Sequence, residues 1–138
     1  MKIGLLSYRS HPYSGGQGIY IRHLSKALMN LGHEVTVLSG PPYPELHRSI
    51  QLIKIPSLGL FESGDRLTGF KLSFLWNLLD FYEWFTVLTG GFPEPYSYGQ
   101  RVERWLKKNN TNFDILLDNQ SLSSSLLRIQ DNYSLAVT

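Results

Sequence analysis

Apolar residues fall in short runs and in helical repeats that alternate along the first forty positions of the chain. Ile3 to Ser7 is a compact apolar run, typical of a strand buried on both faces of a parallel sheet. Gly32 is placed to end the helix that follows, and Glu34–Ser39 predicts a second strand. Strand, helix and strand in this order predict a βαβ unit. From Ile19 onward the helical spacing predicts one apolar face, made of Tyr20, Leu24, Ala27, Leu28 and Leu31.

The middle of the chain predicts a third strand and an aromatic helix. Ile50–Ile55 alternates polar and apolar residues, which suits a strand nearer a sheet edge, and 57–69 has the composition of a loop. Residues 70–88 are rich in Phe, Trp and Leu and predict a buried or half-buried helix. Charged residues interrupt this run, which falls short of the roughly 20 apolar residues that a membrane span needs. The alternative is a surface that meets lipid or a hydrophobic acceptor.

The last third predicts helix, strand, helix and strand. Ser97 and Gln100 have the spacing of a capping box, with Ser97 as the N-cap. The helix that they open is expected to turn Val102, Trp105 and Leu106 inward and to end at Lys107-Lys108, where cations suit the helix dipole. Three further segments are then expected: a strand at 113–117, a helix at 121–130 with Leu122, Leu126 and Ile129 facing in, and a fifth strand at 134–137.

Composition places these elements in one α/β domain. The chain has 138 residues, of which 42% are hydrophobic, so one core is expected rather than disorder. A net charge of only +2 gives no support for nucleic-acid binding. Cysteine is absent, which excludes disulfides and thiolate metal sites, and the N-terminus lacks the pattern of a signal peptide. We therefore expect a cytoplasmic protein with a Rossmann-like parallel sheet that has helices on both faces.

A glycine-rich loop, Ser14 to Gly18, lies between the first strand and the first helix. Ligands of open α/β sheets bind at this carboxyl edge. Glycine allows a ligand to approach the backbone closely, and the free N–H groups of a helix N-terminus favour an anion such as phosphate. An ordinary βα turn uses the same residues, so loop chemistry alone leaves both interpretations open.

Two familiar phosphate loops do not fit these residues. A P-loop continues from its last glycine with Lys and then Ser or Thr, whereas Ile19-Tyr20 follows Gly18. A dinucleotide fingerprint begins directly after the strand, whereas ten residues separate Ser7 from Gly18. It also needs an acidic residue at the end of the second strand, where Ser39 stands.

The loop and its flanks resemble the start of the GT-B glycosyltransferases of family 4. The resemblance rests on 2–8, on Pro12–Gly18, on the "GHEV" turn within 31–37 and on Phe113-Asp114 before an apolar strand. It extends over most of the chain and is diffuse between 59 and 90. It implies two facing Rossmann-like domains, with the acceptor held mainly by the N-terminal half and the nucleotide-sugar donor mainly by the C-terminal half. Retention of the anomeric configuration without a bound metal or cofactor is also implied.

The resemblance implies that Gly15 and Gly16 lie near the donor diphosphate and the acceptor. Other polar residues of the same edge are candidates for binding a sugar or an anionic group. These are Arg9, His11, Tyr13 and Gln17 in the first loop and Asp118, Asn119 and Gln120 after the fourth strand. Their other interpretation is that of ordinary loop polar groups, or of helix capping by Asn119 or Ser121. No catalytic residue and no metal ligand is predicted.

The predicted sheet stops within its fifth strand, which is not a natural domain boundary. We therefore expect 1–138 to be the N-terminal domain of a longer glycosyltransferase that makes a cell-envelope polysaccharide or glycolipid, with its C-terminal domain absent. Without the donor-binding half, these residues alone are expected to give no transfer. Peripheral membrane contact through 70–88 is part of this hypothesis. The alternative is a non-catalytic Rossmann-like binding module that acts with a separate partner chain.

Overall fold

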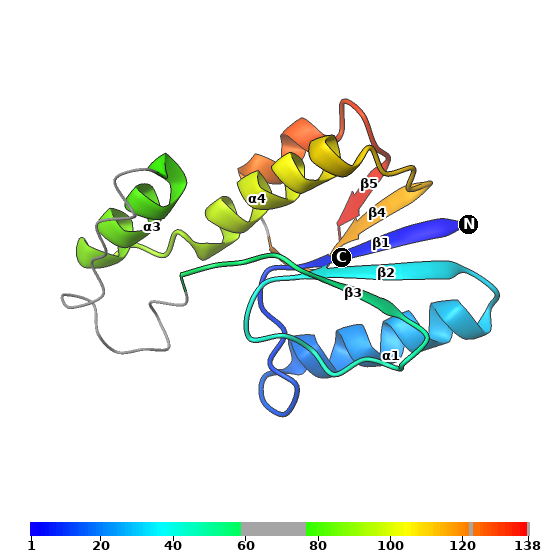
Figure 1. The fold of residues 1–138 in the computed structure, drawn as a ribbon. Coiled ribbons are helices and arrows are strands. Elements are labelled where there is room, and N and C mark those ends of the chain that lie inside the picture. Colours follow the sequence, from blue (N-terminus) through cyan, green and yellow to red (C-terminus); the bar gives the residue numbers. More distant parts are fainter. Residues whose placement is uncertain (59–76, 122, 138) are drawn as a thin grey trace.

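The computed structural model describes residues 1–58, 77–121 and 123–137. Within them, five parallel strands form one sheet in the order β3-β2-β1-β4-β5 (Figure 1). This confirms the predicted α/β class. In the pairing of the strands Ser7 lies opposite Ser39, and Leu6 opposite Asp118, so the carboxyl ends of the strands share one edge. The strands are β1 Lys2–Ser7, β2 Glu34–Ser39, β3 Gln51–Lys54, β4 Ile115–Asp118 and β5 Leu135–Val137.

Helices cover both faces of the sheet. Helix α1 (Gly16–Asn30) lies on one face, and α4 (Glu94–Asn109) lies on the other together with the 3-10 helix η2 (Ser124–Ile129) (Figure 1). The chain moves from β1 to β2 and β3 in one direction, then crosses β1 to reach β4 and β5 on the other side. The sheet therefore has its topological switch point between β1 and β4, where open α/β folds bind ligands.

Each strand sends alternate side chains to the two faces, so the core has two halves. The half under α1 is formed by Ile3, Leu5, Val35, Val37 and Ile21. The half under α4 and η2 is formed by Leu6, Leu38, Leu116, Val102, Leu106 and Leu126. Strands buried on both faces explain the continuous apolar runs from which β1 and β2 were predicted.

The predicted strands are confirmed, with one shift in position. The third strand is at the sheet edge as expected, and the fifth forms as β5. The fourth was expected at 113–117 and occupies Ile115–Asp118 instead. Phe113 does not join it, because its half-buried ring packs against the core under α4. The Asp114 carboxylate accepts a hydrogen bond at 2.6 Å from the backbone amide of Lys2, the first residue of β1.

The predicted inner face of α1 was partly wrong. Ile21 is fully buried and Leu24 half-buried, but Tyr20 and Leu31 are 44% and 73% exposed. The helix begins at Gly16, three residues before the predicted start, and Leu31 lies beyond its end. Its inward face therefore runs through Gly18, Ile21 and Ser25, a stripe that contains small residues and is easily missed in a hydrophobic pattern.

The capping box predicted at Ser97 does not form. Helix α4 begins at Glu94 with Pro95 in its first turn, where a missing N–H costs nothing. Ser97 is therefore inside the helix, and its hydroxyl donates to the Glu94 carbonyl at 3.2 Å. The predicted inward positions are confirmed, since Val102 and Leu106 are buried and Trp105 packs against the same cluster, and Lys107-Lys108 lie in the last turn.

The helix predicted at 121–130 is shorter and of a different type. Only Ser124–Ile129 is helical, as the 3-10 helix η2, with Leu126 and Ile129 buried as predicted. Leu122 lies outside the described residues. The Ser123 hydroxyl accepts from the Ser125 amide at 3.3 Å, and local bonds of this kind compete with a regular α-helix.

Helix α3 (Leu78–Leu88) confirms part of the aromatic helix predicted at 70–88, and it lies beside the first half of α4 (Figure 1). Residues 70–76, and 59–69 of the predicted loop, lie outside the described residues. The helix is half-buried and turns Leu79, Glu83 and Val87 inward. Its outer face is apolar and consists of Leu78, Phe81, Tyr82, Phe85 and Leu88, which we call the aromatic face. In the described part of the chain no helix is long and apolar enough to cross a membrane.

Candidate functional site

A cavity of about 420 Å³ opens at the switch point of the sheet. One wall is the first turn of α1, contributed by Gly16, Gln17 and Tyr20. The other wall is the loop after β4, contributed by Asn119 and Gln120. Two segments about a hundred residues apart in the sequence thus meet where the topology predicts a ligand. We call this the switch-point cavity.

A second cavity of about 320 Å³ adjoins it on the other side of Gly16-Gln17, which line both. We call this the loop cavity. Its remaining lining comes from the β1–α1 loop, namely Tyr8, Arg9, His11, Ser14 and Gly15. The glycine-rich loop is therefore a ridge between two hollows, and a ligand that reaches both must cross its backbone.

The backbone of this ridge is open to such a ligand. Gly15 has φ +69°, a conformation that suits glycine, and it is followed directly by the first turn of α1. A Cβ placed on Gly15 or Gly16 would meet no heavy atom within 4 Å. Among the described residues no side chain caps this helix, and its first turn holds no acidic group. Its free N–H groups can therefore bind an anion.

His11 holds the loop in shape. Its Nδ1 accepts hydrogen bonds from the backbone amides of Tyr13 at 3.1 Å and Ser14 at 3.0 Å. An Nδ1 that accepts is unprotonated, so the neutral ring carries its proton on Nε2. The His11 backbone also packs on α1, where a Cβ on Gly18 would lie 2.0 Å from the His11 carbonyl oxygen. Gly18 thus allows the close approach of loop and helix.

The residues after β4 have different positions. Asn119 is only 2% exposed and lines the switch-point cavity, and within the described structure its Nδ2 has no hydrogen-bond partner. Gln120 is exposed and has φ 57°, an uncommon conformation for a residue other than glycine and one that recurs at functional sites. Asp118 is buried, and its carboxylate accepts from the Ser121 hydroxyl at 2.6 Å and amide at 3.2 Å. Asp118 therefore shapes the turn that presents Asn119.

Arg9 and Tyr13 differ in their relation to the cavities. Arg9 lines the loop cavity, and its Nη1 lies 4.0 Å from the Glu94 carboxylate at the start of α4. Tyr13 is 72% exposed and lines neither cavity. Its hydroxyl donates to the Glu45 carboxylate, which raises the pKa of the Tyr13 phenol. Of the predicted residues, Gly15, Gly16, Gln17, Arg9, His11, Asn119 and Gln120 thus line the cavities, whereas Tyr13 and Asp118 do not.

Tyr98 supports the edge of the sheet from below. Its buried hydroxyl donates to the Leu38 carbonyl at 2.6 Å and accepts from the Ser7 amide at 2.9 Å. Burial raises the pKa of the Tyr98 phenol well above its ordinary value, so the hydroxyl keeps its proton. One side chain of α4 thus joins the ends of β1 and β2 where the site begins.

Sequence reasoning missed three tyrosines of this region. Tyr8 directly follows β1 and lines the loop cavity. Tyr20 was assigned to the core, yet it stands four residues after Gly16 and hence on the same side of the helix, facing the switch-point cavity. Tyr98 was overlooked because it lies within the capping box that was expected at Ser97 and Gln100. The spacing from Gly16 was the available signal for Tyr20.

Comparison with known proteins shows the family of this domain. Residues 14–130, which include both walls of the switch-point cavity, match Glycosyltransferase Family 4. The chain belongs to that family. This confirms the resemblance carried by the glycine-rich loop and the "GHEV" turn, and it identifies the edge described above as that of a glycosyltransferase domain.

A relative and a solved structure add to this assignment. The chain is 45% identical over 130 residues to an "MMP alpha-(1->4)-mannosyltransferase" of Mycolicibacterium hassiacum, a match covering 94% of this chain and 32% of that protein. The chain thus spans about a third of the length of that relative. The C-terminal domain of a Pyrococcus furiosus hydrogenase superposes with a TM-score of 0.54 at 11% identity, covering 99% of this chain and 89% of that one. Such a likeness shows the fold alone.

Proposed function

We propose that residues 1–138 are the acceptor-side domain of a retaining glycosyltransferase that adds mannose to a glycan. The observation that carries the proposal is the switch-point cavity, where the free N–H groups of α1 face Asn119 across a hollow of about 420 Å³. The match to a mannosyltransferase supports mannose as the sugar. A second domain that holds most of the nucleotide-sugar donor completes the site in this proposal.

The residues present suit the charge that develops in such a reaction. The bond between the anomeric carbon and the diphosphate oxygen breaks, a bond to an acceptor hydroxyl oxygen forms, and the proton of that hydroxyl passes to the departing diphosphate. The departing nucleoside diphosphate gains negative charge, which the N–H groups after Gly15 are placed to stabilise. Asn119 Nδ2 is a further donor already freed from water, and Gln120 is exposed for contact with sugar hydroxyls.

A chimera tests the proposal. We expect mannosyl transfer to persist when this chain replaces the matching 130 residues of the M. hassiacum enzyme. Asn119→Ala should lower kcat/KM roughly tenfold, about the effect of losing one well-placed hydrogen bond. Asn30→Ala, at an exposed position at the end of α1, is the matched control. The 138 residues alone should give no turnover. A folded chimera in which Asn119→Ala has no effect would contradict the role given to the cavity.

The aromatic face of α3 favours a peripheral contact with a membrane as a second element of the function. Phe85 is 51% exposed and Leu78 is 82% exposed, and both belong to one helix surface. An exposed surface of this kind is typical of helices that lie in the membrane interface. Trp84 is half-buried, so Phe81 and Phe85 are the better residues to test.

Vesicle flotation tests this contact. Phe81→Ser with Phe85→Ser should reduce the fraction that floats with zwitterionic vesicles, because α3 presents exposed rings and has no basic side chain that would favour anionic lipid. The control is Leu31→Ser, an equally apolar and 73% exposed position at the end of α1. Equal flotation of both variants and the unchanged chain would count against the contact.

A further inference from the structure

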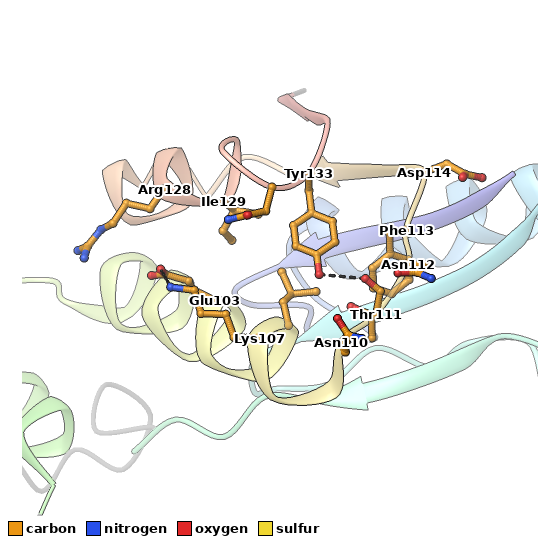
Figure 2. A pocket seen from close by; sticks show the side chains of 12 residues that line it. Glu103, Lys107, Asn110, Thr111, Asn112, Phe113, Asp114, Arg128, Ile129 and Tyr133 are labelled. Carbon is orange, nitrogen blue, oxygen red and sulfur yellow. Dashed lines mark hydrogen bonds and ion pairs between the residues drawn. The ribbon is translucent and has the colours of Figure 1, made fainter.

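A cavity of about 510 Å³ lies at the amino end of β4, the opposite end of the sheet from the glycine-rich loop. Figure 2 shows the side chains that line it. It forms where α4 ends, before β4 begins, and where the chain approaches β5. We call it the lower cavity. Helix α4 has 16 residues and is therefore about 24 Å long. Its first residue, Glu94, pairs with Arg9 of the loop cavity, so the lower cavity is about one helix length from the loop cavity.

Polar groups without partners line the lower cavity. Asn110, Asn112 and Asn132 are exposed, and their side-chain amides make no hydrogen bond within the described structure. The Thr111 hydroxyl oxygen is buried and likewise lacks a partner among the described residues. Buried polar groups are nearly always satisfied, and each amide offers two donors and an acceptor. This lining has capacity for a ligand rich in hydroxyl groups.

The shape of the lower cavity is fixed by a bond between its two loops. The Tyr133 hydroxyl donates to the Thr111 carbonyl at 2.9 Å, and Figure 2 shows this bond crossing between them. Leu106 and Ile129 are buried and Phe113 is half-buried, and these three give the cavity an apolar wall. An apolar wall with a few polar groups around it is the usual design of a small-molecule site.

Charges in the lower cavity are balanced. Lys107 is held 2.7 Å from Glu103, and Asp114 accepts from the Lys2 amide. Arg128 is exposed, and Figure 2 shows it extending away from the other labelled side chains. Two basic and two acidic residues therefore cancel, and nothing in this lining favours an anion over a neutral ligand.

We propose that the lower cavity binds a neutral oligosaccharide, the part of the glycan acceptor that does not react. This rests on the proposed function. A pyranose ring has hydroxyl groups around its rim and C–H groups on its face, which match the amides and the apolar wall. Binding of one end of a long acceptor in the lower cavity raises the effective concentration of its other end at the carboxyl edge of the sheet. A longer acceptor should therefore have a lower KM and the same kcat.

Titration of the ¹⁵N-labelled chain with an α-(1→4)-linked mannotetraose tests the proposal by NMR. The amides of Thr111 and Asn112 should shift with a binding curve of their own. Asn112→Leu with Asn132→Leu should weaken that curve about tenfold through lost hydrogen bonds. Both positions are exposed, and Asn30→Leu is the matched exposed control. Thr111→Val removes the buried hydroxyl at constant shape and should also weaken binding.

The possible outcomes separate this inference from the proposed function. Silence of Thr111 and Asn112 while Gly15 and Asn119 respond overturns the lower cavity as a glycan site and leaves the proposed function standing. The reverse pattern supports the lower cavity and contradicts the proposed function. Equal binding of a nucleoside diphosphate by Thr111 and Asn112 overturns the inference, because a neutral glycan would then not be the preferred ligand.

Discussion

Helices α1 and α3 differ in the residue at the centre of the face that they bury. Helix α1 turns Ile21 into the core and leaves Arg22 and Lys26 in water, the usual arrangement. Helix α3 turns Glu83 inward, at 1% exposure, and presents Phe85 to solvent. Both helices are amphipathic, yet hydropathy alone does not predict that α3 turns a carboxylate inward.

The difference arises from the surface that each helix meets. Helix α1 packs on the apolar side chains of the sheet, whereas α3 packs on α4, which contributes the partly buried Arg101. Arg101 Nη2 lies 2.6 Å from the Glu83 carboxylate and 2.7 Å from that of Asp80. The other oxygen of Glu83 accepts from the Ser57 hydroxyl at 2.9 Å. A carboxylate is buried when such partners replace its water, so the orientation of α3 is determined by a residue of another helix.

The largest effect is expected at the buried carboxylate. Glu83→Ala removes one of the two carboxylates that pair with the partly buried Arg101 guanidinium, which should lower the free energy of unfolding by about 3 kcal/mol, the lower end of the range for breaking a buried ion pair, because Asp80 remains. Urea denaturation measures it. Glu34→Ala is the control, because its exposed pair with Lys2 contributes at most about 1 kcal/mol. A loss no larger than the control's would mean that α3 is held by its apolar contacts.

The next effect concerns the close packing at the start of α1. Gly18→Ala places a Cβ against the His11 carbonyl and should lower the free energy of unfolding by about 1–3 kcal/mol, the usual range for overpacking. Gly16→Ala has open space and should cause no loss. Thermal unfolding of the two variants compares them. Equal stability would show that the loop moves without strain.

A smaller effect is expected in the apolar contact of α1 with the sheet. Ile21→Val removes one methylene from a fully buried side chain and should cost about 0.5–1.5 kcal/mol. Ile19→Val, at a 44% exposed position two residues earlier, should stay within about 0.5 kcal/mol of the unchanged chain. Denaturation midpoints of the pair would show whether the two faces of α1 differ as described. Equal losses would contradict the assigned face.

The smallest effect is expected on the aromatic face. Phe85→Ser should change the free energy of unfolding by no more than about 0.5 kcal/mol, because the ring is half exposed and adds little to the core. Calorimetry measures this change. A loss above 2 kcal/mol would mean that the aromatic face is covered by other parts of the chain.

Most of the fold could be predicted because each strand is marked by a short apolar run in the sequence. The apolar runs of β1 and β2 and the stop at Gly32 are legible within a few residues. The predictions that were wrong depend on close backbone packing and on proline rather than on the hydrophobic pattern. The inner face of α1 follows from the approach of Gly18 to the His11 loop, and the start of α4 follows from prolines that favour the first turn over Ser97 as a cap.

The candidate site could be located from the sequence more easily than its residues could be selected. Parallel strands and a glycine-rich loop predict which edge carries it, and Gly16, Gln17, Asn119 and Gln120 do line one cavity there. Side-chain direction was not predictable. Tyr13 points away from both cavities because its hydroxyl donates a hydrogen bond to the Glu45 carboxylate. This partner is 32 residues away in the sequence, and no local pattern indicates it.

Because the Tyr98 hydroxyl accepts its hydrogen bond, the exchange rate of the Ser7 amide proton reports on opening of the whole carboxyl edge of the sheet. That N–H belongs to the last residue of β1 and donates to a side chain of α4. Its proton can exchange with deuterated water only when the helix and the strand separate, so its protection reports a cooperative opening rather than fraying of the glycine-rich loop. Slow exchange at Ser7 beside fast exchange at Ser14 would show a mobile loop on a rigid base.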